Sequence, residues 1–557
     1  MNIFEQNNDV VGRKKIYTDK VKIDKTNILD ILANAVPIHE QNVGRMKYLL
    51  NYEKGIQPLQ RKKKVRKEID VKCVDNLAHL ITNFKTSYEF GNTITLIQRG
   101  ERDSGKSNES LGISMLNECF ASESVTKVQQ EIARYVEICG IGYSYIDFKK
   151  NRVDGDSFFS YCSLNPLNTF IIRSSYYLDR RPMIAVTYHT DELGNRYYTC
   201  ITEDNRFEVK NLVELIDGKP IPDKERKYEI NDKINDGNPI KNMLGVIPIT
   251  EWELRPDRVG CFEREIAQMD ALNIMESDFI NGLDQNVQSI WQANDIEFPK
   301  DENGEEVKPK SNDWVMTFTT ENGRTPFIKP MTVPYDFKGI LDNIVQSRNS
   351  ILQNACVPQR NDNNGGSTGV AMSDATGWSS AEMSASQVQA MQEASKMNEV
   401  KIALRVIHNA PDSDKNNGIF NKLLKKIKRN SIKPLLDLNY SDVAISVKRQ
   451  KTYEMTVKTN AFATLVSHGV NGLHAIKEIN FFSDPSQVWE DSKDGITKYQ
   501  KSIYDKTNST EKNLDNRGVA FKGEGGMDEN KANRGDRQMG DESDQVNNSN
   551  NIDGIKA

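Results

Sequence analysis

The stretch DRVGCFEREIAQMDALNIMESDFINGLDQNVQSI, residues 257–290, decides how this chain is interpreted. Apolar side chains recur in it every three or four residues, which predicts a single amphipathic helix, roughly 50 Å long at 1.5 Å per residue. Its apolar seam consists of Phe262, Ile266, Met269, Leu272, Phe279, Leu283, Val287 and Ile290. Glu263, Asp270 and Asp284 are spaced by multiples of seven residues, so they share another face of the helix.

A short β segment and a second helix follow. NDIEFP and DWVMTFTTENGRTPFIKP predict strands, and the dipeptide Asn322-Gly323 is a strong β-hairpin signal. The stretch PYDFKGILDNIVQSRNSILQNACVP (334–358) predicts a returning helix with a proline at each limit. The sequence therefore predicts two long helices joined by a small β module.

A polar loop separates the returning helix from a third long one. QRNDNNGGSTGVAMSDATGW (359–378) contains four glycines, and residues 379–408 predict a helix rich in Ala, Ser and Met. The loop resembles a calcium-binding loop only superficially, because Arg360 and Ala371 stand where acidic ligands are needed. No calcium site is predicted.

The rest of the chain mixes helices and strands. IDVKCVDNLAHLITNFKTSYEFG (69–91) predicts a helix, and TITLIQR (93–99) predicts a short strand. Alternating segments over residues 143–212 predict an antiparallel sheet. DVAISVKR (442–449) predicts another strand, and helices are expected over 451–505. Together these elements predict an α+β fold.

Composition limits the function. The 557 residues are 37% hydrophobic, with a mean hydropathy of −0.64, so much of the chain must be surface, linker or disordered. The stretch from residue 506 is polar and charged, which predicts a disordered tail. The net charge of −5 gives no global electrostatic reason to bind nucleic acid. The basic run RKKKVRK (61–67) lacks interleaved aromatic residues and is interpreted as a solvated helix start.

The cysteines and the N-terminus indicate the compartment. The seven cysteines form no CxxC pair, which favours buried thiols in a reducing compartment. The start MNIFEQNNDVVGRKKIY lacks the apolar run of a signal peptide, and no run of eighteen apolar residues occurs. A soluble, cytosolic product is expected.

Residues 100–107, GERDSGKS, match the phosphate-binding pattern G-x-x-x-x-G-K-[ST]. A working site would use Lys106 on the outer phosphates and Ser107 on Mg²⁺. The surroundings argue against one, because the preceding strand ends in polar residues and the downstream strands form an antiparallel series without βαβ units. We interpret the octet as a surface loop and reject Lys106 and Ser107 as a nucleotide site.

Other enzyme signatures are absent. The six histidines include no HxH or HxxxH pair that would suit a metal. There is no GxSxG elbow and no cysteine beside a plausible base. We expect no catalytic residue, no metal site and no cofactor.

The order of elements resembles the portal proteins of tailed double-stranded-DNA bacteriophages, in the siphovirus-type branch. NYEKGIQPLQRKKKV with CVDNLAHLITNFKTSYEFGNTITL is similar to the family's N-terminal block, and EIARYVEICGIGYSYIDF to its helix that enters a strand. GGSTGVAMS resembles the tunnel-loop motif, and the stretch from DVAISVKRQ to DPSQVWE resembles the C-terminal pattern. The resemblance covers about residues 40–505. Relative to the family pattern, residues 101–109 are interpreted as an insertion between a strand and the next helix.

The resemblance implies an architecture of wing, stem, clip, tunnel loop and crown. The implied parts are an N-terminal polar and helical segment (1–39), the wing (40–256), a stem helix (257–290), the clip (291–333), a second stem helix (334–358), the tunnel loop (359–378), a long wing helix with a returning strand (379–450), crown helices (451–505) and a disordered tail (506–557).

It also implies roles for particular residues. Glu263, Asp270 and Asp284 would line the stem channel or, as an alternative, face solvent outside it. The tunnel-loop candidates are Gly365, Gly366, Gly369, Val370, Met372 and Trp378, and the alternative for this segment is a plain disordered loop. The candidates for clip docking are Trp314, Asn322, Gly323 and Phe327.

By resemblance the protein is a non-enzymatic ring, usually of twelve copies, at one capsid vertex in the virion, assembled in the host cytoplasm. Viral double-stranded DNA would pass through it independently of sequence during packaging and ejection. Its partners would be the terminase large subunit, a head-completion or adaptor protein, the scaffold and the major capsid protein, without a membrane. The alternatives are a nucleotide-driven DNA-packaging enzyme that uses GERDSGKS and another virion structural protein, such as an adaptor or baseplate component.

Overall fold

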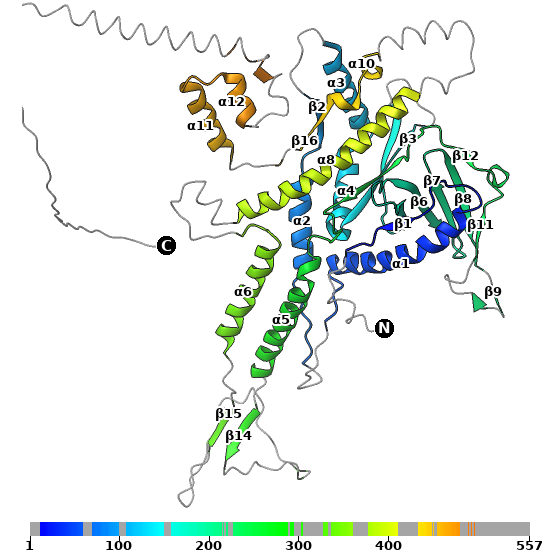
Figure 1. Cartoon of the computed structure of the whole chain (residues 1–557). Coiled ribbons are helices and arrows are strands. Elements are labelled where there is room, and N and C mark those ends of the chain that lie inside the picture. The colour runs from blue at the N-terminus through cyan, green and yellow to red at the C-terminus, as the bar shows by residue number, and fades with distance from the viewer. Residues whose placement is uncertain are drawn as a thin grey trace, which may run out of the picture. The chain divides into compact units, whose positions relative to one another are not determined.

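The computed structural model describes most of the chain between residues 12 and 495 (Figure 1). The described residues are 12–59, 69–99, 107–149, 157–213, 215–216, 219–220, 227–287, 290–294, 302, 304, 327–331, 336–359, 377–409, 433–447, 449, 454–479, 488–489, 492 and 495. The chain divides into two compact units, Met1–Trp489 and Glu490–Ala557. The first unit carries every element below, and the predicted tail 506–557 lies outside the described residues.

A seven-stranded sheet forms one core with helix α1 (Ile28–Glu53). Its strands are β1 (Ile16–Thr18), β5 (Thr169–Ser174), β6 (Pro182–Thr190), β7 (Arg196–Ile201), β8 (Asn205–Asn211), β11 (Tyr228–Ile230) and β12 (Ile240–Lys241). Strand β1 runs parallel to β5, and the other pairs are antiparallel. Because α1 runs through residue 39, the predicted boundary between an N-terminal segment and the wing falls inside a helix.

A smaller sheet is made of β13 (Ile249–Glu253), β3 (Ile141–Phe148) and β4 (Phe159–Leu164). The face that carries Ser144 and Trp252 packs against α4 (Val125–Cys139) and α8 (Trp378–Asn409). The prediction of one sheet over 143–212 is therefore wrong, since the segment divides between two sheets. Strand β13 pairs with β3 and so places β3 and β4 in a sheet of their own. It lies about a hundred residues further along the chain, so the local sequence pattern of β3 gives no sign of this pairing.

A third group of elements surrounds a two-stranded ribbon. Strand β2 (Thr95–Gln98) pairs antiparallel with β16 (Val443–Ser446), so both strands occur where the alternation predicted them. Helices α3 (Ser107–Ser122) and α10 (Lys433–Leu436) pack beside this ribbon in the same core. The helix predicted over 69–91 is shorter in the structure, where α2 spans Leu77–Phe90. Residues 69–76, which were predicted to be helical, form an extended segment.

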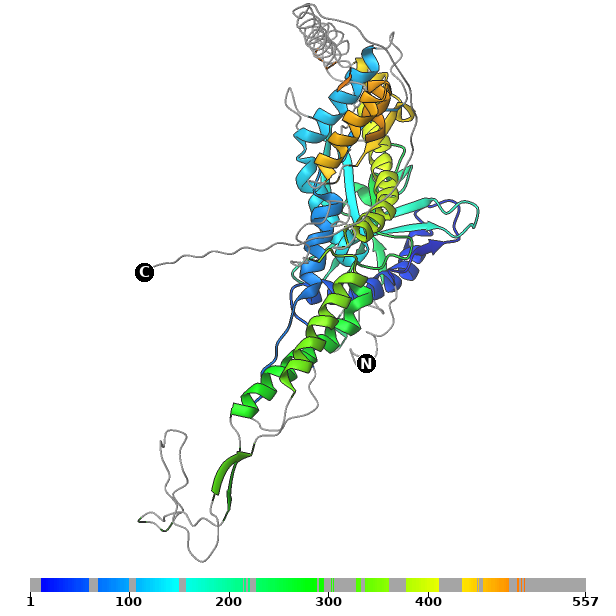
Figure 2. The same cartoon turned by 90° about the vertical axis from the view of Figure 1, so that its left-hand side faces the viewer.

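Helices α5 (Ile266–Val287) and α6 (Phe337–Asn354) form an antiparallel pair, side by side in Figures 1 and 2. Ring contacts join Phe279 to Phe337, while the Asn354 amide reaches Glu265 at the other end. Strands β14 (Ile290–Asn294) and β15 (Phe327–Met331) pair beyond the helices. The chain thus runs away from the two sheets along α5 and runs back toward them along α6.

Both helices are shorter than predicted. The stretch 257–290 contains a turn, a 3-10 segment (Glu263–Glu265), α5 and the first residue of β14. Arg258 has a left-handed φ of 56°, which a helix cannot accommodate, so the helix starts later. Helix α6 begins where the Asp336 carboxylate caps Gly339 N at 2.9 Å, and it ends before Cys356, whose φ is 55°.

Two helices lie within 451–505, where helices were predicted: α11 (Glu454–Ser467) and α12 (Gly472–Ile479), which pack against each other. The minor strands β9 (Leu215–Ile216) and β10 (Lys219–Pro220) form a separate pair. Within the described ranges, no helix combines the length and the apolar character that a membrane crossing would require.

Candidate functional site at the base of helix α5

Two backbone segments cross closely where α5 begins. A Cβ on Gly140, which has a φ of +77°, would lie 2.2 Å from the Arg258 carbonyl oxygen. A Cβ on Gly260 would lie 2.3 Å from the Ile138 carbonyl oxygen. Only glycine permits either approach. The crossing wraps the turn 257–262 around the C-terminal end of α4, and Cys261 N donates to a main-chain oxygen of that helix at 2.8 Å.

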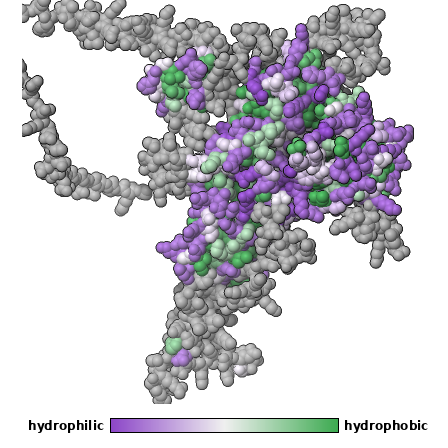
Figure 3. Space-filling model, viewed as in Figure 1, coloured by the Kyte–Doolittle hydropathy of each residue, from purple (hydrophilic) through white to green (hydrophobic). Residues whose placement is uncertain are grey.

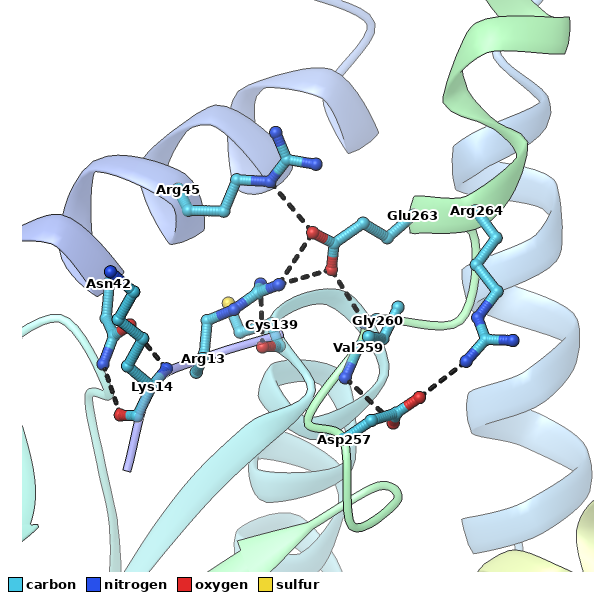
Figure 4. Close-up of polar contacts among 10 residues, drawn as sticks. All are labelled: Arg13, Lys14, Asn42, Arg45, Cys139, Asp257, Val259, Gly260, Glu263 and Arg264. Atoms are coloured by element: carbon cyan, nitrogen blue, oxygen red, sulfur yellow. Dashed lines mark hydrogen bonds and ion pairs between the residues drawn. The ribbon is translucent and has the colours of Figure 1, made fainter. Parts of the chain in front are cut away.

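Glu263 lies at this crossing, and its side chain is fully buried. The Arg13 guanidinium donates to both carboxylate oxygens, at 2.7 and 2.5 Å (Figure 4). Arg45 Nε and Gly260 N add hydrogen bonds of 2.9 and 3.0 Å. A carboxylate enclosed by two guanidinium groups within its own chain cannot reach a channel. The prediction that Glu263 lines one is therefore wrong, and the residue anchors the root of α5 instead.

The N-terminal segment is held in place by matching contacts. Asn42 on α1 accepts a hydrogen bond from Lys14 N at 2.8 Å and donates to the Lys14 carbonyl oxygen at 2.9 Å. Arg13 also donates to the carbonyl oxygen of Cys139, at the end of α4, at 3.1 Å. Burial raises the pKa of the Cys139 thiol to about 12, so this cysteine stays a neutral core residue. One short segment thus joins α1, α4 and the base of α5.

A second ion network lies beside the first. Arg258 contacts Glu251 at 2.8 Å and Glu253 at 2.7 Å, and Arg173 also pairs with Glu251. Burial alone would raise the pKa of Glu251, but Arg258 and Arg173 outweigh it, so the pKa lies below its usual value. The turn that starts α5 is therefore tied electrostatically to both sheets.

A buried cluster of two glutamates and a lysine lies under the same turn. Glu137 on α4 faces Glu89 and Lys85 on α2, and all three side chains are buried. Lys85 Nζ lies 3.5 Å from Glu89 Oε1 and donates to Ser384 Oγ on α8 at 2.9 Å. Burial first, and then the charge of Glu89, raise the pKa of Glu137 well above its usual value. The folded protein therefore holds the proton of Glu137 more tightly than the unfolded chain does.

The other two predicted channel acids differ from each other. The Tyr52 hydroxyl donates to Asp270 Oδ1 at 2.8 Å, so this carboxylate is directed toward α1. Burial raises the pKa of Asp270, and the hydrogen bond from Tyr52 opposes the rise. Asp284 is partly exposed near the C-terminal end of α5. A channel-facing role stays a prediction for Asp270 and Asp284.

A polar ladder fixes α5 to the extended segment 69–76. Three buried residues on one face of α5 form it, at four-residue spacing: Asn273, Ser277 and Asn281. The Asn281 amide exchanges two hydrogen bonds with the backbone of Val71, each 2.8 Å. Ser277 Oγ accepts from Cys73 N at 3.0 Å, and Asn273 accepts from Asp75 N at 2.9 Å. Alternate residues of the extended segment are thus held as in a strand pair.

Trp378, the last residue of the predicted tunnel loop, is the first residue of α8, and its role in that loop stays a prediction. Its ring lies 6.0 Å from Phe84 and 5.6 Å from Tyr88 on α2, and this aromatic cluster fixes the helix end. The other tunnel-loop candidates lie outside the described residues: Gly365, Gly366, Gly369, Val370 and Met372.

Little of the predicted clip is described. Phe327 begins β15, pairs with Asn294 of β14 and is 37% exposed. Trp314, Asn322 and Gly323 lie outside the described residues. Their role in docking stays a prediction.

The octet GERDSGKS lies between β2 and α3. Lys106 is outside the described residues, and Ser107 is the first residue of α3. The predicted insertion 101–109 therefore ends inside a helix. Among the described strands, β2 pairs only with β16, in an antiparallel ribbon, whereas a phosphate-binding loop needs the end of a central parallel strand. The described part of the chain also contains no cluster of three or more His, Cys, Asp or Glu that could hold a metal ion.

Sequence reasoning missed Arg13, Arg45 and the Asn273 ladder. The spacing N-x-x-x-S-x-x-x-N on α5 was a usable signal, because polar residues four apart on an otherwise apolar helix must find partners. Arg13 carried no local signal, since its partner Glu263 is 250 positions away.

The fold and this site define an α+β protein built around an antiparallel helix pair that is anchored by buried ion pairs. The family described as phage portal protein, SPP1 Gp6-like, matches residues 32–433. The chain belongs to this family of phage portal proteins, and it is a structural portal protein of the virion rather than a member of an enzyme family.

Solved structures give more distant likenesses. A chain in the neck of an empty gene transfer agent (GTA) particle is 10% identical, with a TM-score of 0.36, and the match covers 71% of this chain and 87% of that one. A chain in the virion of a native GTA particle is 9% identical, with a TM-score of 0.35 and coverages of 76% and 90%. No curated protein matches. The assignment rests on the family match.

Proposed function

We propose that this chain assembles into a closed ring of about twelve copies at one capsid vertex. Viral double-stranded DNA passes through the ring during packaging and ejection. The ring also serves as a platform for the terminase large subunit during packaging, for a head-completion protein afterwards, and for the scaffold and the major capsid protein during assembly. Family membership supports this proposal.

The main observation in favour of a ring is that apolar side chains of the α5–α6 pair are exposed. Only Ile344 and Ile351 are buried along the eighteen residues of α6. Leu341 and Val345 are 47% and 50% exposed, and Leu283 on α5 is 40% exposed. Figure 3 shows hydrophobic residues at the surface among hydrophilic ones in this part of the chain. Apolar side chains on a two-helix hairpin favour burial against neighbouring copies.

The proposed parts follow the predicted order with revised limits. Helices α5 and α6 form the stem, β14 and β15 belong to the clip, and 360–376 is the tunnel loop. The two larger sheets with α1, α4 and α8 form the wing, and α11 with α12 belongs to the crown. Asp284 is the best remaining candidate for a channel-lining acid, because it is partly exposed far from the buried root.

A channel through which DNA moves should bind that DNA only weakly. Phosphate contacts from lysine and arginine produce tight, salt-dependent binding that would stall moving DNA. The net charge of −5 is consistent with weak binding. Acidic side chains on the channel wall, such as Asp284, would repel the DNA backbone and keep it mobile.

Electron microscopy of the purified protein tests the ring. End-on class averages should show about twelve subunits around an open channel. The double variant Leu341→Ser and Val345→Ser should assemble poorly. Leu111→Ser, at a residue 51% exposed on α3, is the matched control and should leave assembly intact. Particles without a channel, or stem variants that assemble like the unaltered protein, would contradict the proposal.

A further inference from the structure

An exposed aromatic hairpin projects from the seven-stranded sheet. The turn 175–181 joins β5 to β6, and Tyr176, Tyr177 and Leu178 in it are 57%, 72% and 69% exposed. The two tyrosine rings lie 5.6 Å apart. Three consecutive exposed apolar side chains are unusual on a soluble surface and indicate contact with another protein. We name residues 175–181 the tyrosine hairpin.

The edge strand β1 extends this surface. Ser175 N donates to the Thr18 carbonyl oxygen at 2.9 Å, which places the end of β1 beside the hairpin. Tyr17 and Val21 there are 40% and 84% exposed. Residues 17–22 and 175–181 together carry four cationic side chains against two carboxylates: Lys20, Lys22, Arg180 and Arg181 against Asp19 and Asp179. The surface is therefore apolar with a basic rim.

The opposite end of the same strands carries an acidic counterpart. The turn 191–195 joins β6 to β7, and Leu193 at its tip is 79% exposed. Val213 N donates to Asn195 Oδ1 at 2.8 Å, which brings Leu212, 37% exposed, beside the turn. Asp191 and Glu192 are the charged residues of this surface, which comprises 191–195 and 212–213 and is named the leucine turn.

Hydrogen bonds within the leucine turn keep Asp191 negatively charged. Asp191 accepts hydrogen bonds from Leu193 N at 3.0 Å and from Asn195 N at 2.8 Å. The hydrogen bond from the Asn195 side chain, together with these backbone bonds, holds the pKa of Asp191 below its usual value. Asp191 therefore stays anionic, shapes the turn and presents Glu192 and Leu193 outward.

We infer that the tyrosine hairpin of one copy docks on the leucine turn of the next copy in the ring, an inference that rests on the proposed ring. Strand β6, nine residues long, separates the two surfaces by roughly 30 Å. Two complementary surfaces at opposite ends of one subunit form head-to-tail contacts, which propagate around a ring. Docking of hairpin on hairpin would instead bring like charges together.

A charge-reversal cycle tests the contact. Arg180→Glu and Glu192→Arg alone should each raise the protein concentration needed for ring assembly by about two- to fivefold, as for a rim charge pair. The two changes combined should recover part of the loss, because opposite charges face each other again. Tyr177→Ser should raise that concentration by about tenfold or more, as for an aromatic anchor.

Matched controls separate docking from folding. All these side chains are exposed, so the variants should melt at the temperature of the unaltered protein. Met243→Ser, at a residue 71% exposed elsewhere, should assemble normally. Reversals without effect, or a combination no better than the single changes, would overturn the inference.

Cross-linking distinguishes failure of this contact from failure of the ring. Leu178→Cys and Leu193→Cys together, in a Cys162→Ser background, should give a ladder of covalent multimers with a short bifunctional maleimide. Neither cysteine alone should do so, because each faces a leucine of the neighbouring copy. Rings without a ladder would overturn only the docking contact. Absence of both rings and ladder would contradict the proposed function as well.

Discussion

Glu263 and Arg13 lie 250 positions apart and form a fully buried ion pair, with Nη2 and Oε2 separated by 2.5 Å. The pair fastens the N-terminal segment to the root of α5, at the point where the chain leaves the two sheets for the helix pair. The Glu263 carboxylate is thus linked to α1 through Arg45 and to the end of α4 through Arg13.

Glu263→Gln should destabilise the protein by about 3–5 kcal/mol, because two guanidinium groups would lose their shared carboxylate in a buried place. Chemical denaturation would measure the loss. The neighbouring change Arg264→Gln is the control: Arg264 is 56% exposed and pairs with Asp257, so its removal should cost no more than about 1 kcal/mol. Equal losses for the two variants would contradict the anchoring role.

Gly140→Ala should cost about 2–4 kcal/mol, since its φ is +77° and a Cβ would lie 2.2 Å from the Arg258 carbonyl oxygen. The opposite change in stability is expected for Gly44→Ala, because Gly44 lies inside α1 with nothing within 4 Å of an added Cβ. That change should stabilise the protein by up to about 1 kcal/mol. Thermal unfolding of both variants measures the contrast, and a harmless Gly140→Ala would refute the close crossing.

Asn281→Ala should loosen the extended segment, because the backbone of Val71 would lose both of its hydrogen bonds. We expect a cost of about 1–3 kcal/mol and faster amide hydrogen exchange at Val71 and Cys73. Gln268→Ala, at an exposed position on the same helix, should change neither quantity. Unchanged exchange in Asn281→Ala would show that the ladder does not hold the segment.

The raised pKa of Glu137 predicts a pH dependence of stability. Its folded pKa lies well above the ordinary value of 4.5, so the folded protein binds this proton more tightly than the unfolded chain. The resulting stability is complete below pH 4.5 and is lost as the pH rises toward the folded pKa. Glutamine has no proton to lose, so the stability of Glu137→Gln should rise relative to that of the unaltered protein as the pH rises from 4.5 toward the folded pKa.

Melting temperatures across that range measure the gain. The exposed change Glu118→Gln on α3 should show a constant difference from the unaltered protein. A constant difference for Glu137→Gln as well would mean that Glu137 is ionised in the folded protein.

Lys106→Ala should leave DNA packaging unchanged, because strand β2 before the octet lies in an antiparallel ribbon and not in a parallel sheet. Phage yield and the DNA content of capsids measure the outcome. A nucleotide-driven enzyme that used this octet would lose packaging completely, and such a loss would restore the alternative function.

Local patterns predicted the elements whose formation depends on local residues. The long helix α8 was predicted within a residue at each end, and β2 and β16 occur where alternation placed them. The division of 143–212 into two sheets was missed, because β13 takes β3 as its partner from a distant part of the chain. Pairing partners at such separations leave no trace in the periodicity of either strand.

The candidate site was harder to predict for a related reason. A glutamate beside an apolar seam is usually solvated, so Glu263 was expected on an open face. Its burial depends on Arg13 and Arg45 and on the close approach that Gly260 permits. Each of these residues is unremarkable alone, and only the tertiary crossing turns them into an anchor.

The most direct test of the central claim is electron cryomicroscopy of the assembled virion without imposed icosahedral symmetry. If the chain forms the proposed ring, density for it should lie at a single vertex, as a ring into which the α5–α6 pair fits, with DNA aligned on its axis. Density for this chain at many vertices, or its absence from the vertex through which DNA passes, would contradict the proposed function.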